Sequence, residues 1–159
     1  MQQRVNEHPR QVLFKDMSAT PPVDWTYEQI YRHLKEISAI ICKTVSEEPR
    51  VAIYTENCVE GACVDLSCLC SRIFISPISI HFGVEIVSAL FDKLSINMAF
   101  ADTPQRIAVL EKVNEMTAKR FQILTISPGS KKGSSVAYLQ EECKKLSRSE
   151  IEDLSLIHI

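Results

Sequence analysis

The sequence predicts an α/β fold in which helices flank a parallel sheet. Helical stripes of apolar residues alternate with short β-branched runs between residues 26 and 126. Such alternation is typical of parallel sheets whose connections are helices. The chain has 159 residues, which is enough for one hydrophobic core. With 45% hydrophobic and 24% charged residues, the composition is that of a globular protein and excludes disordered, collagen-like and coiled-coil classes.

The first predicted helix follows an irregular N-terminal arm. Residues 1–24 contain one short apolar run and a double proline, so we expect no regular element there. Thr26, with Gln29 three residues later, has the spacing of a capping box, which predicts a helix N-terminus. The apolar stripe of this helix consists of Ile30, Leu34, Ile37, Ile41 and Val45. Pro49 ends the helical region.

A strand and then three further helix–strand pairs are predicted after this helix. Strands are expected at 50–54, 73–75, 96–101 and 121–126. Asn57 is expected to open the second helix, and Pro104 lies in the first turn of the fourth. The stripes of the three helices are Val59, Cys63, Leu66 and Cys70, then Val87, Leu90, Phe91 and Leu94 in a helix near 84–94, then Ile107, Leu110 and Val113. Residues 25–126 therefore form the predicted α/β subdomain.

The tail at 127–153 differs from the subdomain in composition. Residues 127–135 (SPGSKKGSS) form a polar loop by composition, and residues 141–153 are mostly charged. The charged part is predicted to be either a solvated helix or a linker. Because it offers little apolar surface of its own, we expect it to pack on something further along the chain.

Charge and hydropathy exclude several classes of partner. Lys plus Arg number 18 and Asp plus Glu number 20, so the net charge is −2 and predicts no nucleic-acid partner. The most apolar stretch, 73–96, is interrupted by charges and Pro77, so no transmembrane segment is expected. The start of the chain lacks the apolar region of a secretion signal. Six cysteines without such a signal predict free thiols in a cytoplasmic protein.

The cysteines and one Gly/Ser/Lys loop are candidates for chemistry. Cys58, Cys63, Cys68 and Cys70 are crowded, but zinc needs sulfurs that converge on one centre. On a helix, Cys63 and Cys70 share the apolar face while Cys58 and Cys68 point elsewhere, so packing is the favoured interpretation. The loop fails the Walker pattern, because three residues separate Gly129 from Gly133 and Ser134 follows in place of Lys.

His81 and three carboxylates are the remaining candidates. His81 comes just after a predicted strand, where α/β proteins place ligand sites, but no charged partner is near it in sequence. Glu56, Glu60 and Asp65 have helical spacings without the features of an acid–base pair. The residues alone therefore assign no catalytic, cofactor-binding or metal-binding side chain.

Three segments in the same order and spacing resemble a known superfamily. They are residues 25–30 (WTYEQI), residues 50–54 (RVAIY) with Asn57, and residues 69–78 ending in Pro77 and Ile78. These segments are similar to the first core motifs of the AMP-forming acyl-CoA synthetases and adenylation domains, and the resemblance runs from about residue 25 to 121. The stretch 54–60 is most similar to the long-chain fatty acyl-CoA synthetase branch.

Three positions depart from the motifs of that superfamily. Gln29 replaces Glu in the first core motif. In the second core motif, at residues 69–78, Arg72 stands at the usual Gly and Ile75 replaces an aromatic residue. These motifs are structural in the superfamily, so the departures do not touch its chemistry directly. They do put the exact subfamily in doubt.

The resemblance implies a truncated N-terminal subdomain of an adenylate-forming enzyme. Such a parent enzyme would use ATP and Mg²⁺ to convert a carboxylic acid, here a fatty acid, to an acyl-adenylate, and would then transfer the acyl group to CoA. The family's phosphate loop, adenine and ribose groups and C-terminal Lys lie downstream of such a segment. We therefore expect this fragment to be inactive and to bind none of these cofactors. We also expect Ile107, Leu110 and the residues near Phe121 to lack packing partners.

Residues 154–159 (LSLIHI) are interpreted as a processing scar. The codons CTG TCT CTT ATA CAC ATC encode this hexapeptide, and that string resembles a transposase end sequence used as a sequencing adapter. Two alternatives to the synthetase fragment stay open. One is a complete small α/β binding or regulatory domain without catalysis, and the other is an adenylating enzyme of the same superfamily that uses no CoA.

Overall fold

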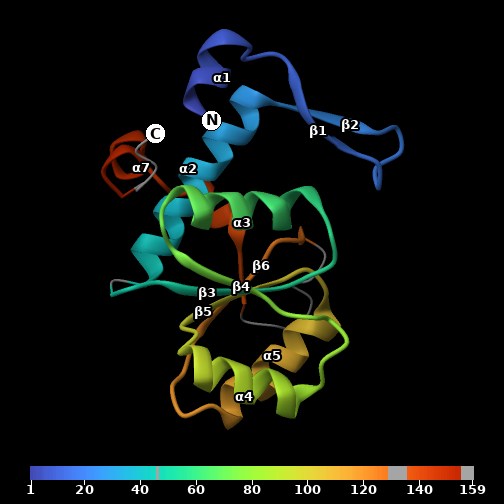
Figure 1. Ribbon diagram of the computed structural model, residues 1–159, viewed down its shortest axis with the longest axis vertical. Coiled ribbons are helices and arrows are strands. Elements are labelled where there is room, and N and C mark those ends of the chain that lie inside the picture. The colour runs from blue at the N-terminus through green and yellow to red at the C-terminus, as the bar shows by residue number, and fades with distance from the viewer. Residues whose placement is uncertain (46, 129–135, 155–159) are drawn as a thin grey trace.

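The computed structural model describes residues 1–45, 47–128 and 136–154. At its centre lies a five-stranded sheet in the order β4-β3-β5-β6-β7 (Figure 1). The strands are β3 (Arg50–Tyr54), β4 (Phe74–Pro77), β5 (Met98–Ala101), β6 (Gln122–Thr125) and β7 (Ala137–Tyr138). All four neighbouring pairs are parallel, which confirms the predicted fold class.

Helices cover both faces of this sheet, as Figure 1 shows. One face carries α2 (Tyr27–Thr44), α3 (Val59–Cys70) and α6 (Leu139–Lys144), and the other carries α4 (Val84–Leu94) and α5 (Pro104–Met116). The predicted bounds of the helix at 84–94 are confirmed. The predicted stripe of Ile107, Leu110 and Val113 is confirmed as the buried face of α5.

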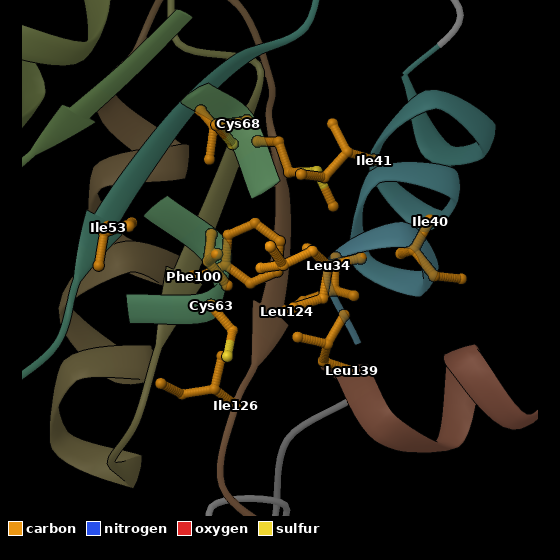
Figure 2. Close-up of a cluster of buried hydrophobic side chains, with 14 of the residues drawn as sticks. Leu34, Ile40, Ile41, Ile53, Cys63, Cys68, Phe100, Leu124, Ile126 and Leu139 are labelled. Atoms are coloured by element: carbon orange, nitrogen blue, oxygen red, sulfur yellow. The ribbon is translucent and has the colours of Figure 1, made fainter. Parts of the chain in front are cut away.

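Two hydrophobic cores form because successive strand residues point to opposite faces of a sheet. Val51 and Ile53 belong to the core under α2 and α3, whereas Ala52 and Tyr54 belong to the core over α4 and α5. Figure 2 shows the first core, in which Phe100 of β5, Leu34 of α2 and Cys63 of α3 are fully buried.

Two of the predicted helix starts are confirmed and one is wrong. The Thr26 hydroxyl accepts a hydrogen bond from the Gln29 amide at 3.3 Å, and the Gln29 side chain accepts one from the Thr26 amide at 2.8 Å. Pro104 lies in the first turn of α5, as expected. Asn57, however, does not cap α3. The cap is Cys58, whose Sγ accepts a hydrogen bond from the Gly61 amide at 3.3 Å.

The buried side of α3 also differs from the predicted stripe. Cys63 is buried as expected, but its companions on the buried side are Val64, Ser67 and Cys68, and Cys70 is only half-buried. The Ser67 hydroxyl donates to the Leu34 carbonyl oxygen of α2 at 2.8 Å. Since α3 contacts both α2 and the sheet, two neighbours set its buried side, and a single apolar stripe does not predict it.

The N-terminal segment is regular, so the prediction of an irregular arm was wrong. It forms α1 (Gln2–Glu7) and a two-stranded antiparallel sheet of β1 (Val12–Asp16) and β2 (Val23–Thr26). Phe14 pairs with Trp25, and Lys15 forms an ion pair with Asp24 at 3.4 Å. The double proline lies in the connection between the two strands, where proline removes no ladder hydrogen bond.

The tail packs on an element that precedes it in the chain, contrary to the prediction. After β7 come α6 and α7 (Arg148–Leu154), and both contact α2. Leu139 and Cys143 are buried, and Lys43 of α2 forms an ion pair with Glu150 of α7 at 2.8 Å. The predicted polar loop lies largely outside the described residues, as do residues 155–159 of the proposed scar; Leu154 is the last residue of α7.

The expectation that Ile107, Leu110 and the residues near Phe121 lack partners was also wrong. All three named side chains are buried in the second core. The rings of Phe91 and Phe121 pack edge to face with centroids 4.8 Å apart. This core is therefore closed by α4 and α5 within the chain itself.

Arg72 provides a prediction about stability. Its φ of 57° lies in the left-handed region, where a Cβ atom costs about 1 kcal/mol or more, and it stands at the usual Gly of the second motif. We expect Arg72→Gly to be more stable than Arg72→Ala by about 1 kcal/mol in urea unfolding. Arg72→Ala is the matched control, because it removes the same side chain but keeps Cβ. Equal stabilities of the two variants would contradict the prediction.

Candidate functional site

The strand order has one point at which the chain reverses direction across the sheet. From β3 the chain moves to β4 on one side and then crosses back to β5 on the other. In open α/β sheets, the crevice beyond the carboxyl ends of the strands at such a point is where ligands bind. Residues 55–58, after β3, and residues 102–103, after β5, are therefore the first candidates for a site.

A cavity of about 720 Å³ lies at this point. The loop after β3, the first turn of α3, the loops after β5 and β6, and the hairpin of β1 and β2 all contribute to its lining. A second cavity of about 340 Å³ lies between α3 and the ends of β3 and β4. Glu56, Asn57 and Cys58 line both cavities, so the turn after β3 separates them.

Three charged side chains join the carboxyl ends of β3 and β5. Arg106 of α5 donates to Asp102 at 2.6 Å and to Glu56 at 2.7 Å. The other oxygen of Asp102 accepts a hydrogen bond from the Glu56 amide at 2.9 Å. Asp102 and Arg106 are mostly buried, whereas the Glu56 side chain is 67% exposed. This network fixes the turn after β3 against the start of α5.

Only one of the side chains predicted from sequence joins this network. Glu56 does, whereas Glu60 lies in the first turn of α3 at the larger cavity and Asp65 lines the smaller one. His81 is exposed in the loop after β4. Asp102 and Arg106 were not predicted from the sequence, although their spacing of four residues around Pro104 at a helix start is a signal for a salt bridge.

Tyr54 fixes the loop that carries His81. Its hydroxyl is within hydrogen-bonding distance of the Phe82 carbonyl oxygen, at 3.0 Å, and of the Ile80 carbonyl oxygen, at 3.3 Å. Burial raises the pKa of the Tyr54 hydroxyl, so it stays protonated and can donate. His81 itself is oriented by no side chain that the structure describes, apart from the Ser79 hydroxyl near its amide.

All six cysteines are free thiols in the structure. Burial raises the pKa of Cys63 and of Cys143 to about 12, and it raises the pKa of Cys68 as well. Burial also raises the pKa of Cys58, despite its place at a helix N-terminus, and nearby Glu60 and Asp102 add to the effect. These thiols are therefore protonated at neutral pH and are poor nucleophiles.

The burial of these thiols predicts two classes of reactivity. Cys63, Cys68 and Cys143 are buried, whereas Cys42, Cys58 and Cys70 are half-buried. In the native protein we expect the buried class to react with a thiol reagent only as fast as the chain opens, and the other class to react faster. Mass spectrometry of tryptic peptides after timed labelling measures this. Uniform labelling of all six cysteines without denaturant would contradict the prediction.

The cavity lining does not fit the anionic and metal groups that an adenylating reaction needs. Among the residues that the structure describes, four carboxylates (Asp16, Glu56, Glu60 and Asp102) and one basic residue, Lys15, line the larger cavity. A polyphosphate would be repelled there. Within the described ranges, no three His, Cys, Asp or Glu side chains are grouped as a metal site. We therefore derive no step through ATP or Mg²⁺ at this position.

Comparison with known proteins identifies the family. The sequence profile of AMP-binding enzymes matches residues 1–154. The chain belongs to this family. In sequence, no curated protein matches the chain significantly.

Solved structures support the same fold for this member of the family. One is the inhibitor-bound N-terminal domain of FACL13 from Mycobacterium tuberculosis, with a TM-score of 0.71 and 18% identity over 92% of this chain and 34% of that one. Another is an acyl-CoA synthetase from Brucella canis, with a TM-score of 0.69 and 15% identity over 86% of this chain and 25% of that one. A third is the luciferase-like enzyme of the nonluminescent mealworm Zophobas morio, with a TM-score of 0.74 and 10% identity over 91% of this chain and 33% of that one.

These comparisons also set the relative size of the chain. It spans between a quarter and about a third of the solved chains that it resembles. The part of the chain that the structure describes contains no helix long and apolar enough to cross a membrane.

Proposed function

We propose that this chain is the N-terminal part of an ATP-dependent, AMP-forming acyl-CoA synthetase. The whole enzyme would join a carboxylic acid to AMP with release of pyrophosphate, and would then transfer the acyl group to the thiol of CoA. We propose a fatty acid as the substrate, because residues 54–60 are most similar to the long-chain branch, and the cytoplasm as the location.

The observation that carries this proposal is the family match over residues 1–154. The three similar segments support it, because each has a structural place: residues 25–30 lie at the start of α2, residues 50–54 form β3, and residues 69–78 contain β4. Two of the similar structures are described as an acyl-CoA synthetase and a domain of FACL13, which supports the choice of branch. The chain covers 25–34% of these proteins, so the activity belongs to the longer enzyme.

This chain contributes a scaffold to the proposed enzyme. The closed cores on both faces of the sheet hold β3 and β5 in register, and Arg106 fixes the turn after β3 against the start of α5. Because carboxylates outnumber basic groups among the described residues that line the cavity beyond β3 and β5, the anionic groups of ATP and of a fatty acid would have to bind to other parts of the enzyme. A transition state with a pentacoordinate phosphate needs positive groups around it, and the described residues do not gather them.

Acid-dependent ATP–pyrophosphate exchange tests this proposal. The 159-residue chain should show no exchange above a no-protein control with any member of a fatty-acid panel. A longer chain, obtained by reading the source locus beyond Asp153, should show exchange with one or more of these acids. Thioester formation with added CoA separates a synthetase from an adenylating enzyme that uses no CoA. Exchange by the 159-residue chain would mean that the active site lies within it.

A second candidate is favoured by the burial of Ile107, Leu110 and Phe121. A fragment with open cores would expose such side chains, so their burial supports a complete small α/β binding or regulatory domain. A monomer with a sharp cooperative melt and no binding of an apolar dye would favour this candidate. A natural stop codon after Ile159 would favour it decisively over the fragment.

A further inference from the structure

A third cavity, of about 340 Å³, lies at the edge of the sheet opposite the candidate site. Its lining comes from the loops that lead into β3, β5 and β6, so it lies at the amino ends of these strands. Ligand pockets measure about 300–1,000 Å³, so the cavity can hold a small organic molecule. Open α/β sheets bind their reactants beyond the carboxyl ends of the strands, so this cavity is separate from the proposed function.

The Asn97 residue joins the three loops around this cavity. Its side-chain oxygen accepts a hydrogen bond from the Arg50 amide at 2.8 Å, and its side-chain nitrogen donates to the Glu48 carbonyl oxygen at 3.1 Å. Its backbone carbonyl oxygen accepts from the Gln122 amide at 3.0 Å. The starts of β3, β5 and β6 are therefore held together, and a ligand would not have to order them.

Two apolar side chains and one hydroxyl group form the buried part of the described lining. Phe91 and Ile96 are the apolar residues. Thr117, which follows α5, is 9% exposed, and its hydroxyl has no hydrogen-bond partner among the described residues. A buried polar group without a partner is costly, because it has lost its hydrogen bonds to water. A ligand that bonds to Thr117 would remove this cost.

Charged side chains of opposite sign stand on opposite sides of the cavity. Exposed Glu47 and Glu48 belong to the loop before β3, whereas exposed Lys119 and Arg120 belong to the loop before β6. Since β5 lies between β3 and β6, the two loops are separated by two strand spacings, or about 10 Å. One side of the cavity is therefore negative and the other positive.

The two other charged residues of the described lining have structural partners. The Arg50 Nε donates to the Leu94 carbonyl oxygen, and the Arg50 guanidinium stacks on the Phe74 ring. One carboxylate oxygen of Asp92 accepts from the Ala118 amide at 3.0 Å. One of these residues is positive and the other negative, so they leave the charge separation between the two loops unchanged.

We propose that this cavity binds a small zwitterionic ligand with an apolar side chain, of the class of the apolar α-amino acids. Its ammonium group faces the carboxylates of the loop before β3, and its carboxylate faces the cations of the loop before β6. Its side chain packs on Phe91 and Ile96, and the Thr117 hydroxyl donates to its carboxylate. A ligand with a single charge would be repelled by one of the two loops.

Calorimetric titration of the 159-residue chain with L-phenylalanine and with L-leucine tests this site. We expect saturable binding of one molecule per chain. Three compounds are matched controls for L-phenylalanine: phenethylamine lacks its carboxylate, phenylpropionate lacks its ammonium group, and glycine lacks its apolar side chain. Each should bind at least about fivefold more weakly. No binding of either amino acid, or equal binding of phenethylamine or phenylpropionate, would overturn the inference.

Paired charge variants test the two ends of the ligand separately. Glu47→Gln with Glu48→Gln should weaken L-phenylalanine about fivefold without weakening phenylpropionate, which has no ammonium group. Lys119→Gln with Arg120→Gln should weaken L-phenylalanine similarly without weakening phenethylamine. Glu85→Gln is the matched control, since Glu85 is an exposed carboxylate in the first turn of α4, at the far end of that helix from the cavity. Affinities equal to that of the control would overturn the inference.

Thr117→Val separates a lost contact from a damaged fold. Valine has a shape similar to that of threonine but no hydroxyl, so the variant should weaken L-phenylalanine about fivefold. The same change removes an unpartnered buried hydroxyl, so it should raise the midpoint of urea unfolding of the free chain. Unchanged affinity, or weaker binding together with a lower midpoint, would overturn the role of this hydroxyl in the site.

Discussion

Replacing Phe100 with alanine should lower the free energy of unfolding by about 3–5 kcal/mol. Phe100 is fully buried in β5, which lies between β3 and β6, so neighbours surround its ring on every side. The substitution removes the buried ring and leaves a cavity that the paired strands cannot close by moving together. Urea unfolding followed by circular dichroism measures the loss.

Phe74→Ala is the matched control for this prediction. Phe74 lies on the edge strand β4 and is 37% exposed, and its ring packs under the Arg50 guanidinium at 4.0 Å. Losing this exposed contact should cost about 1 kcal/mol. If both alanine variants lost the same stability, the first core would not be the main source of stability.

The parts of the fold that the sequence predicts well are those whose signals are local. The helix at 84–94 has its bounds as predicted because its apolar stripe is uninterrupted, and α2 begins at Thr26 because both partners of the capping box are close in sequence. The strands predicted to start at Ile73 and Ile96 start one and two residues later, at Phe74 and Met98, because hydrogen-bond pairing with β3 sets where each strand starts.

The parts that the sequence did not predict depend on distant partners. β7 has two residues and is a strand only because it pairs with β6. β1 has a visible apolar run, but its regularity comes from β2, across a connection that contains the double proline. The tail helices carry few apolar side chains, and α2 supplies the surface that Leu139 and Cys143 need.

The candidate site likewise depends on residues that are distant in sequence. Glu56 could be singled out from sequence, but its partner Arg106 lies 50 residues later. Parallel pairing of β3 and β5 brings the two side chains together. β5 lies beside β3 because the chain passes through β4 and then crosses back, and this strand order is a property of the whole sheet. The four cysteines that are crowded in sequence divide into two buried side chains, Cys63 and Cys68, and two half-buried ones, Cys58 and Cys70.

Asp102→Ala should lower the free energy of unfolding by about 2–3 kcal/mol. The Asp102 side chain is 12% exposed, and it holds both the Arg106 guanidinium and the Glu56 amide. Its loss leaves a mostly buried guanidinium with one exposed carboxylate and frees the turn after β3. Glu56→Ala is the matched control, because it removes the exposed partner of the same guanidinium, and it should cost less than about 1 kcal/mol.

A double variant tests whether the stability lost in Asp102→Ala comes from leaving the Arg106 charge without its buried partner. Asp102→Ala combined with Arg106→Met removes the buried charge along with its partner, so the double variant should recover part of the stability lost in Asp102→Ala. Urea unfolding of the four proteins, including the parent chain, gives the coupling free energy. A double variant whose loss equals the sum of the two single losses would show that Asp102 and Arg106 are not coupled. The turn after β3 would then be held by its backbone alone, and Glu56 would lose its defined place at the rim of the cavity.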